Sequence, residues 1–149
     1  MSIYLNSDKS LINYNKLINT KYFVDKTLLI EKTNEVIDTT DCYICITRPR
    51  RFGKSSVTDM LGSYYGKAVD SKDIFDKLNI SSCESYEENL NKYNVISISF
   101  NEISENMKTY HDYINNIIQE LRKEVLRTFN IEDVSDLDSL SRVLEKSKQ

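Results

Sequence analysis

The amino-acid sequence predicts an α/β fold, in which helices flank a parallel β-sheet. Segments with the apolar spacing of helices alternate with two apolar runs, 42–47 and 95–100, that have the length and composition of buried strands. The chain has only 3 Gly and 1 Pro among its 149 residues, whereas all-β folds use both residues to end their strands. This length is enough for one domain with a buried core.

The N-terminal part of the chain has the weaker pattern. Residues 1–20 are rich in Asn, Ser and Lys and form a poorly defined leader. A short helix within it is indicated by the spacing of its apolar residues Leu11, Tyr14, Leu17 and Ile18. Residues 21–129 form the predicted core. It begins with a short extended run at 22–24, after which Asp25 is placed to cap a helix that continues to about Glu35.

The middle of the chain has the order strand, loop and helix. The apolar run 42–47 is the first predicted strand, and residues 48–53 form a tight loop. A helix begins at Lys54, because the apolar residues that follow it have helical spacing. This order is typical of a parallel α/β unit.

The C-terminal part continues the alternation. The second strand, 95–100, leads into a long amphipathic helix at about 107–129, which has the strongest periodicity in the sequence. Residues 130–149 contain a last short helix. Because two strands do not form a stable sheet, we expect the fold to be truncated here and completed beyond Gln149.

The charge distribution indicates a local binding site for an anion. The formal net charge is −3, which argues against a protein that coats nucleic acid non-specifically. Four cations nevertheless lie close together, at Arg48, Arg50, Arg51 and Lys54. No run approaches the ~20 apolar residues that cross a membrane, and the N-terminus lacks the pattern of a signal peptide. With an odd cysteine count of 3, the sequence predicts a cytoplasmic protein without a membrane partner.

Residues 53–55, Gly-Lys-Ser, match the end of the phosphate-binding P-loop, or Walker A motif, G-x-x-x-x-G-K-[ST]. Glycine lets successive backbone N–H groups approach a phosphate at the positive end of a helix. Lys54 would reach the β- and γ-phosphates, and the Ser55 hydroxyl would join the shell of a magnesium ion. The predicted nucleotide-binding residues are Arg48, Pro49, Arg50, Arg51, Phe52, Gly53, Lys54, Ser55 and Ser56.

Two positions depart from this pattern. Arg48 stands where the pattern has its first glycine, and Pro49 has no N–H to donate to a phosphate. A helix start capped by glycine and serine, with surface arginines beside it, would contain the same residues without binding a nucleotide.

The C-x-x-C spacing of Cys42 and Cys45 is interpreted as two buried apolar cysteines in a strand. Residues three apart in a strand face opposite sides, which disfavours a redox pair. The same geometry argues against a zinc site made of Cys42, Cys45, Cys83 and His111.

Two segments together resemble a known family. Residues 22–27 are Tyr-Phe-Val-Asp-Lys-Thr, and residues 47–55 are Thr-Arg-Pro-Arg-Arg-Phe-Gly-Lys-Ser. The pair resembles the "YxVDKT" and "TRPRRFGKS" segments of the predicted AAA-ATPase-like family of bacteria, in which arginine at the first-glycine position is itself the pattern. The similarity extends from about Leu11 to Phe129. It implies the N-terminal part of an AAA-type ATPase module that binds ATP with Mg²⁺ at residues 48–56.

The resemblance carries further expectations. Members of this family often continue into a nuclease-like domain of the restriction-endonuclease type, which is absent from this chain, and no particular substrate is implied. Nucleic acid binding is not indicated by this segment, and a homo-oligomer is left open. The resemblance makes Asp25 and Lys26 candidates for contacts near the nucleotide, whereas the local pattern assigns them to the start of a helix.

The sequence does not supply the catalytic group of an ATPase. Such an enzyme needs an acidic residue at the end of a second strand to hold magnesium and position water. Glu102 follows the run 95–100, but we expect the acidic residue beyond Gln149 and predict no catalytic residue. Two functions stay open: the nucleotide-binding part of an ATPase, and a non-catalytic interaction module whose degenerate P-loop neither binds nor hydrolyses nucleotide.

Overall fold

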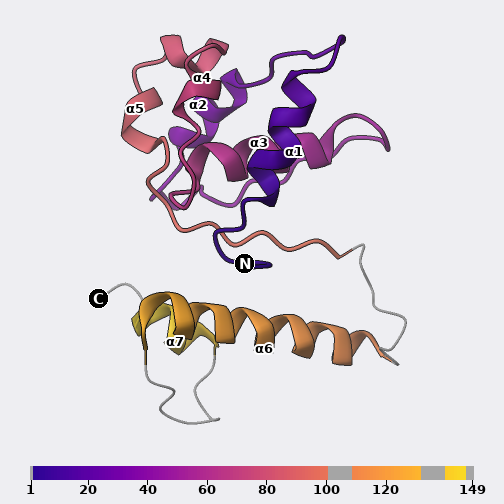
Figure 1. Cartoon of the computed structure of the whole chain (residues 1–149), viewed down its shortest axis with the longest axis vertical. Helices are drawn as coiled ribbons and strands as arrows, with labels where there is room; N and C mark the ends of the chain where they lie inside the picture. The colour runs from indigo at the N-terminus through magenta and orange to yellow at the C-terminus, as the bar shows by residue number, and fades with distance from the viewer. Residues whose placement is uncertain (1, 101–108, 132–139, 147–149) are drawn as a thin grey trace. The chain divides into compact units, whose positions relative to one another are not determined.

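The computed structural model describes residues 2–100, 109–131 and 140–146. Its helices are α1 Lys9–Ile18, α2 Leu28–Asn34, α3 Lys54–Tyr65, α4 Lys72–Phe75, the 3-10 helix η1 Asn79–Ser82, α5 Tyr86–Asn89, α6 Tyr110–Phe129 and α7 Leu140–Lys146 (Figure 1). The chain divides into two compact units, which are described separately. One is Asn6–Val95, and the other combines Met1–Leu5 with Ile96–Gln149.

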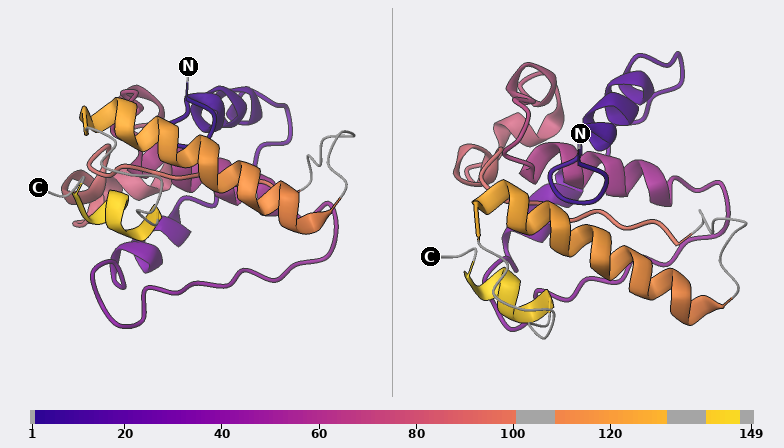
Figure 2. Two further views of the ribbon diagram at one scale, coloured as in Figure 1. Left: turned by 90° about the horizontal axis from the view of Figure 1, so that it is seen from below. Right: turned by 60° about the horizontal axis from the view of Figure 1, so that its bottom comes forward.

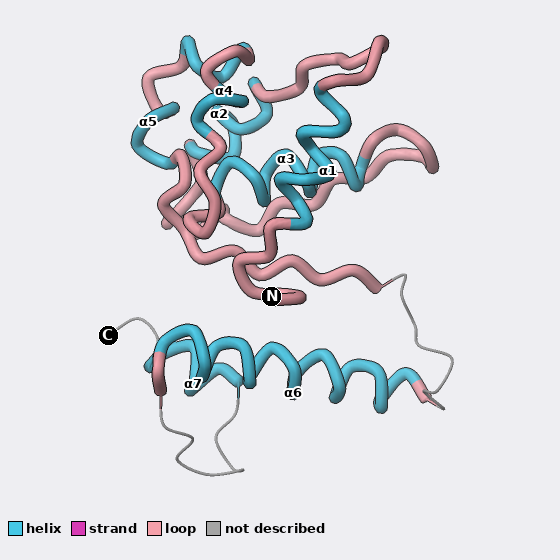
Figure 3. Tube along the Cα trace, in the orientation of Figure 1, coloured by secondary structure: helices cyan, strands magenta, loops and turns pink. Residues whose placement is uncertain are grey.

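The predicted α/β fold with a parallel sheet is wrong. The part of the chain that the structure describes consists of helices and loops, with no strand (Figure 3). Strand-like pairing is limited there to two isolated bridges, an antiparallel one between Leu5 and Ile96 and a parallel one between Gly66 and Tyr93.

The two apolar runs do not form strands because neither finds a neighbouring strand. Among the described residues, no backbone hydrogen bond joins 42–47 to another segment, and Tyr43 is 93% exposed. Within 95–100, the N–H of Ser97 donates to the carbonyl of Tyr4 at 2.9 Å, but this pairing does not continue into a ladder. A run of apolar, β-branched residues favours an extended conformation. It forms a strand only when a neighbouring strand pairs with its backbone N–H and C=O groups.

The connection between α2 and α3 is a long loop, residues 35–53, which contains the first apolar run and the arginine-rich segment (Figure 2). Cys42 and Cys45 are exposed, so the prediction that they are buried in a strand is wrong. The described residues form no sheet that could cover them. The described residues, which include Cys83 and His111, contain no cluster of side chains suited to a metal ion.

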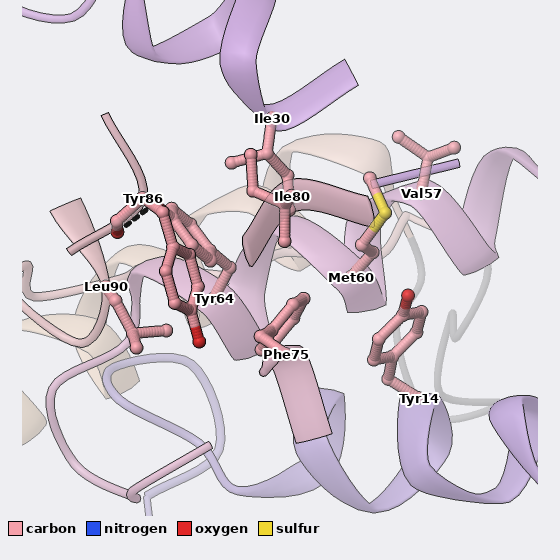
Figure 4. Packing of buried hydrophobic residues seen from close by; sticks show 9 residues of the cluster. All are labelled: Tyr14, Ile30, Val57, Met60, Tyr64, Phe75, Ile80, Tyr86 and Leu90. Atoms are coloured by element: carbon pink, nitrogen blue, oxygen red, sulfur yellow. Dashed lines mark hydrogen bonds between the residues drawn. The ribbon is translucent and has the colours of Figure 1, made fainter. Parts of the chain in front are cut away.

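The core of the Asn6–Val95 unit is helical and rich in aromatic residues. α1 packs against α3. The buried cluster contains Tyr14, Ile30, Val57, Met60, Tyr64, Phe75, Ile80, Tyr86 and Leu90 (Figure 4). Phe75 stacks on Tyr14 with ring centroids 5.5 Å apart and meets Tyr64 edge-to-face at 5.4 Å. The predicted leader therefore contributes α1, and with it Tyr14, to the core.

Asn91 holds the C-terminal end of α3. Its side-chain amide donates to the carbonyl of Gly66, which caps α3, at 2.7 Å, and its Oδ1 accepts the N–H of Ser71 at 3.1 Å. Its backbone lies in the left-handed region, with φ 54°. Because α3 is held at this end and packed against α1, its first turn has a defined position at the end of the arginine-rich loop.

The second unit is built on α6. Thr109 caps the start of this helix, and its hydroxyl accepts the N–H of Asp112 at 3.1 Å. The buried carboxylate of Glu124 accepts the N–H groups of residues 3, 4 and 5 at 2.5, 3.0 and 2.8 Å. α7 packs against α6.

The helical predictions for the C-terminal part are confirmed within the described residues. The long amphipathic helix predicted at about 107–129 is present as α6, and the last short helix is present as α7. None of the described helices combines the length and the apolar character needed to cross a membrane.

Candidate functional site

The arginine-rich loop turns into α3 at Gly53. The φ angle of Gly53 is 78°, a left-handed conformation that favours glycine. The first hydrogen bond of the helix runs from the N–H of Val57 to the carbonyl of Gly53 at 3.0 Å, and no side chain among the described residues caps the helix. The N–H groups of residues 54–56 therefore have no acceptor within the helix and can donate to a ligand.

Lys54 folds back over the loop. Its Nζ donates to the carbonyl of Arg48 at 2.5 Å and to that of Pro49 at 3.0 Å. These bonds tie the first residue of α3 to the beginning of the loop. Because the side chain is exposed, its ammonium can exchange these carbonyls for an anion without unfolding the helix.

A pocket of about 350 Å³ lies beside this loop, lined by α1, residues 22–24, Lys26, residues 51–53 and the first turns of α3. Pockets that bind small molecules commonly have volumes of about 300–1,000 Å³. The wall contains both aromatic side chains, such as Phe23, and the cations Lys26 and Arg51. It can accommodate a ligand that is flat and apolar at one end and negatively charged at the other.

Lys26 lies close to the turn into α3. A Cβ atom added to Gly53 would be 3.1 Å from the Nζ of Lys26. Lys26 and Arg51 line the pocket beside this turn, and Lys54 follows the turn as the first residue of α3. Their combined charge favours an anion at the N-terminus of α3.

Asp25 has a structural role. Its Oδ1 accepts both the N–H and the hydroxyl of Thr27 at 2.7 Å, and its Oδ2 accepts the N–H of Asn79 at 2.7 Å. The fully buried Thr27 hydroxyl accepts the N–H of Ile80 at 3.1 Å. Burial acts to raise the pKa of Asp25, but the hydrogen bonds from Asn79 and Thr27 outweigh it, so the pKa lies below its ordinary value of 3.8.

Asp25 is therefore not the helix cap that the sequence predicts. The cap position of α2 is Thr27, and Asp25 stands two residues earlier, where it joins the start of α2 to η1. The local assignment of Asp25 to a structural role is nevertheless confirmed, whereas Lys26 lines the pocket.

The pocket divides the predicted binding residues into two groups. Four of them line it: Arg51, Phe52, Gly53 and Ser56. The others lie in the exposed loop and helix start beside it: Arg48, Pro49, Arg50, Lys54 and Ser55. Glu102 lies outside the described residues.

Sequence reasoning missed Tyr14, Leu17 and Phe23, which also line the pocket. Tyr14 and Leu17 lie on the apolar stripe of α1, and this helical spacing indicates only burial. Tyr14 is 2% exposed, and its hydroxyl has no hydrogen-bond partner among the described residues. A motif search could not find these residues, because the tertiary packing of α1 against α3 places them here.

Comparison of the sequence with known families gives a match that includes the arginine-rich loop and the pocket residues. A family model described as predicted AAA-ATPase matches residues 10–149. No curated protein and no solved structure matches the chain. The matched range includes α1 except for Lys9, the pocket residues, the arginine-rich loop and α6. The chain therefore belongs to the predicted AAA-ATPase family.

Proposed function

We propose that this chain binds ATP together with Mg²⁺ at residues 48–56, as part of an AAA-type ATPase. The observation that carries the proposal is the junction at Gly53, where a cationic loop meets the uncapped first turn of α3. Such a helix start offers N–H donors and a positive dipole end to a phosphate. Membership of the predicted AAA-ATPase family supports ATP as the anion.

Lys54 has the largest part in this proposal. When the nucleotide binds, its Nζ leaves the carbonyls of Arg48 and Pro49 and donates to the β- and γ-phosphates. This exchange is favourable because a hydrogen bond between two charged groups is stronger than one to a neutral carbonyl. The exposed Ser55 hydroxyl joins the Mg²⁺ shell, and backbone N–H groups after Pro49 donate to the phosphate oxygens.

One observation favours the non-catalytic interaction module instead. The Lys54 ammonium already has two acceptors within its own loop, at 2.5 and 3.0 Å. If these bonds persist in solution, the loop is closed on itself and does not admit a phosphate chain.

Calorimetric titration with Mg-ATP tests the proposal on three proteins. The wild type should bind, and Lys54→Ala should lose measurable binding, with a dissociation constant higher by at least about 50-fold, because a charge-assisted contact to phosphate is lost. The control is Lys92→Ala, which removes the same charge from an exposed position that lines a different pocket. It should bind Mg-ATP like the wild type.

Equal affinity of the wild type and Lys54→Ala for Mg-ATP would contradict the assigned site. A ligand that binds the folded state must raise the melting temperature. If millimolar Mg-ATP neither binds nor raises the melting temperature of the wild type, the interaction module is the better account.

A further inference from the structure

The hydroxyl of Tyr14 is a buried polar group without a partner in the part of the chain that the structure describes. The ring is fixed by its stack on Phe75, with centroids 5.5 Å apart, and by an edge-to-face contact with Phe23 at 6.3 Å. Its hydroxyl end points toward the side of the cluster that Val57 and Met60 occupy (Figure 4). Both of those residues line the pocket together with Tyr14.

A buried hydroxyl without a hydrogen bond destabilises a folded protein, and buried polar groups are nearly always paired. A phenylalanine would fill the same space without this cost. Burial, and next the charge of Asp25, raise the pKa of Tyr14 well above its ordinary value of 10.0, so the hydroxyl stays neutral near pH 7. A neutral phenol both donates and accepts a hydrogen bond.

The surroundings of this hydroxyl suit a flat ring with polar atoms on its edge. Phe23 and the exposed Phe52 line the pocket, and aromatic side chains stack favourably on nucleobases. Gly53 and Ser56 connect the pocket to the turn that is proposed to hold the phosphates. A nucleotide has this arrangement, with a base at one end and phosphates at the other.

We infer that the pocket holds the base of the bound nucleotide and that the Tyr14 hydroxyl hydrogen-bonds to the edge of its ring, which makes Tyr14 a specificity-determining residue. This inference rests on the proposed function, because the phosphates at the Gly53 turn direct the base into the pocket. Tyr14 thereby obtains the hydrogen bond that the free protein does not supply.

The test compares two ligands, Mg-ATP and inorganic triphosphate with Mg²⁺, on the wild type and on Tyr14→Phe. This substitution keeps the ring and removes a hydroxyl that has no partner, so the melting temperature of the free protein should stay the same or rise. Affinity for Mg-ATP should fall about 3- to 10-fold, the factor expected for one neutral hydrogen bond. Affinity for triphosphate should not change. Tyr110→Phe, at a tyrosine that is 67% exposed, is the matched control and should change neither affinity.

Each other outcome has a distinct meaning. If Tyr14→Phe binds Mg-ATP like the wild type, or if it weakens triphosphate by the same factor, Tyr14 does not contact the base. If the wild type binds triphosphate as tightly as Mg-ATP, the base is not held in the pocket, although the phosphate site stands. If the wild type binds neither ligand, the proposed function itself fails.

Discussion

Two short segments, 25–27 and 48–56, lie within the range that the family model matches, and the structure uses them in opposite ways. In the first, the carboxylate of Asp25 accepts the N–H groups of Thr27 and Asn79 and the hydroxyl of Thr27. The same hydroxyl accepts the N–H of Ile80. In the second, the cations are exposed and the first turn of α3 has no cap. Lys26 belongs to the first segment by sequence but reaches the Gly53 turn of the second.

This difference in hydrogen bonding and exposure separates residues that stabilise the fold from residues that can contact a ligand. A side chain whose hydrogen bonds are all made within the fold contributes to stability, and its removal leaves unpaired groups behind. An exposed cation contributes little to stability and can be exchanged for a ligand contact. Substitutions in the first segment should therefore change stability, and substitutions in the second should change binding.

The largest effect on stability is expected for Asp25→Ala. It leaves the N–H of Asn79 and both donors of Thr27 without their acceptor, so the free energy of unfolding should fall by about 2–3 kcal/mol. Urea unfolding measures this change. Asp41→Ala, at an exposed aspartate, is the control and should stay within about 0.5 kcal/mol of the wild type.

Acid titration of the same proteins sharpens this comparison. The pKa of Asp25 lies below 3.8 in the folded state, so its contribution to stability is complete above that value and is lost as the pH falls through the folded pKa. Between about pH 5 and pH 2, the wild type should therefore lose more stability than Asp25→Ala. An equal loss of unfolding free energy in both proteins would contradict the structural role assigned to Asp25.

A smaller effect is expected for Gly53→Ala, at the turn where Lys26 and the second segment meet. The left-handed backbone, with φ 78°, costs an alanine about 1–2 kcal/mol of unfolding free energy. The added Cβ would also lie 3.1 Å from the Nζ of Lys26 and push that flexible side chain away. Urea unfolding should show the loss of stability, and calorimetry should show weaker Mg-ATP binding. Unchanged stability would mean that this turn adopts another conformation in solution.

The sequence predicts the helices of this fold better than its architecture. The helix from Lys54 and the long helix α6 are found because their apolar residues recur at helical spacing over several turns. The runs 42–47 and 95–100 have the composition of strands but lack a neighbouring strand among the described residues. The composition of a segment indicates its preferred conformation, whereas a sheet forms only if another strand lies next to that segment.

The candidate site is predictable only where it is contiguous in the sequence. The loop and helix start at 48–56 are contiguous in the sequence, and Gly53 has a left-handed backbone that favours glycine. Tyr14 and Lys26 reach the pocket through tertiary packing and carry no local signal for it. Asp25 was a candidate for both roles, and the hydrogen bond that it accepts from distant Asn79 assigns it to the fold.

Hydrogen–deuterium exchange with and without Mg-ATP tests the central claim most directly, because it observes both segments in one experiment. The account predicts that Mg-ATP slows exchange of the N–H groups in residues 50–56, where the phosphates bind. The N–H groups of Asn79 and Ile80, already bonded to Asp25 and Thr27, should exchange at unchanged rates. Unchanged exchange at 50–56 in the presence of saturating Mg-ATP, or slowing confined to Asn79 and Ile80, would contradict it.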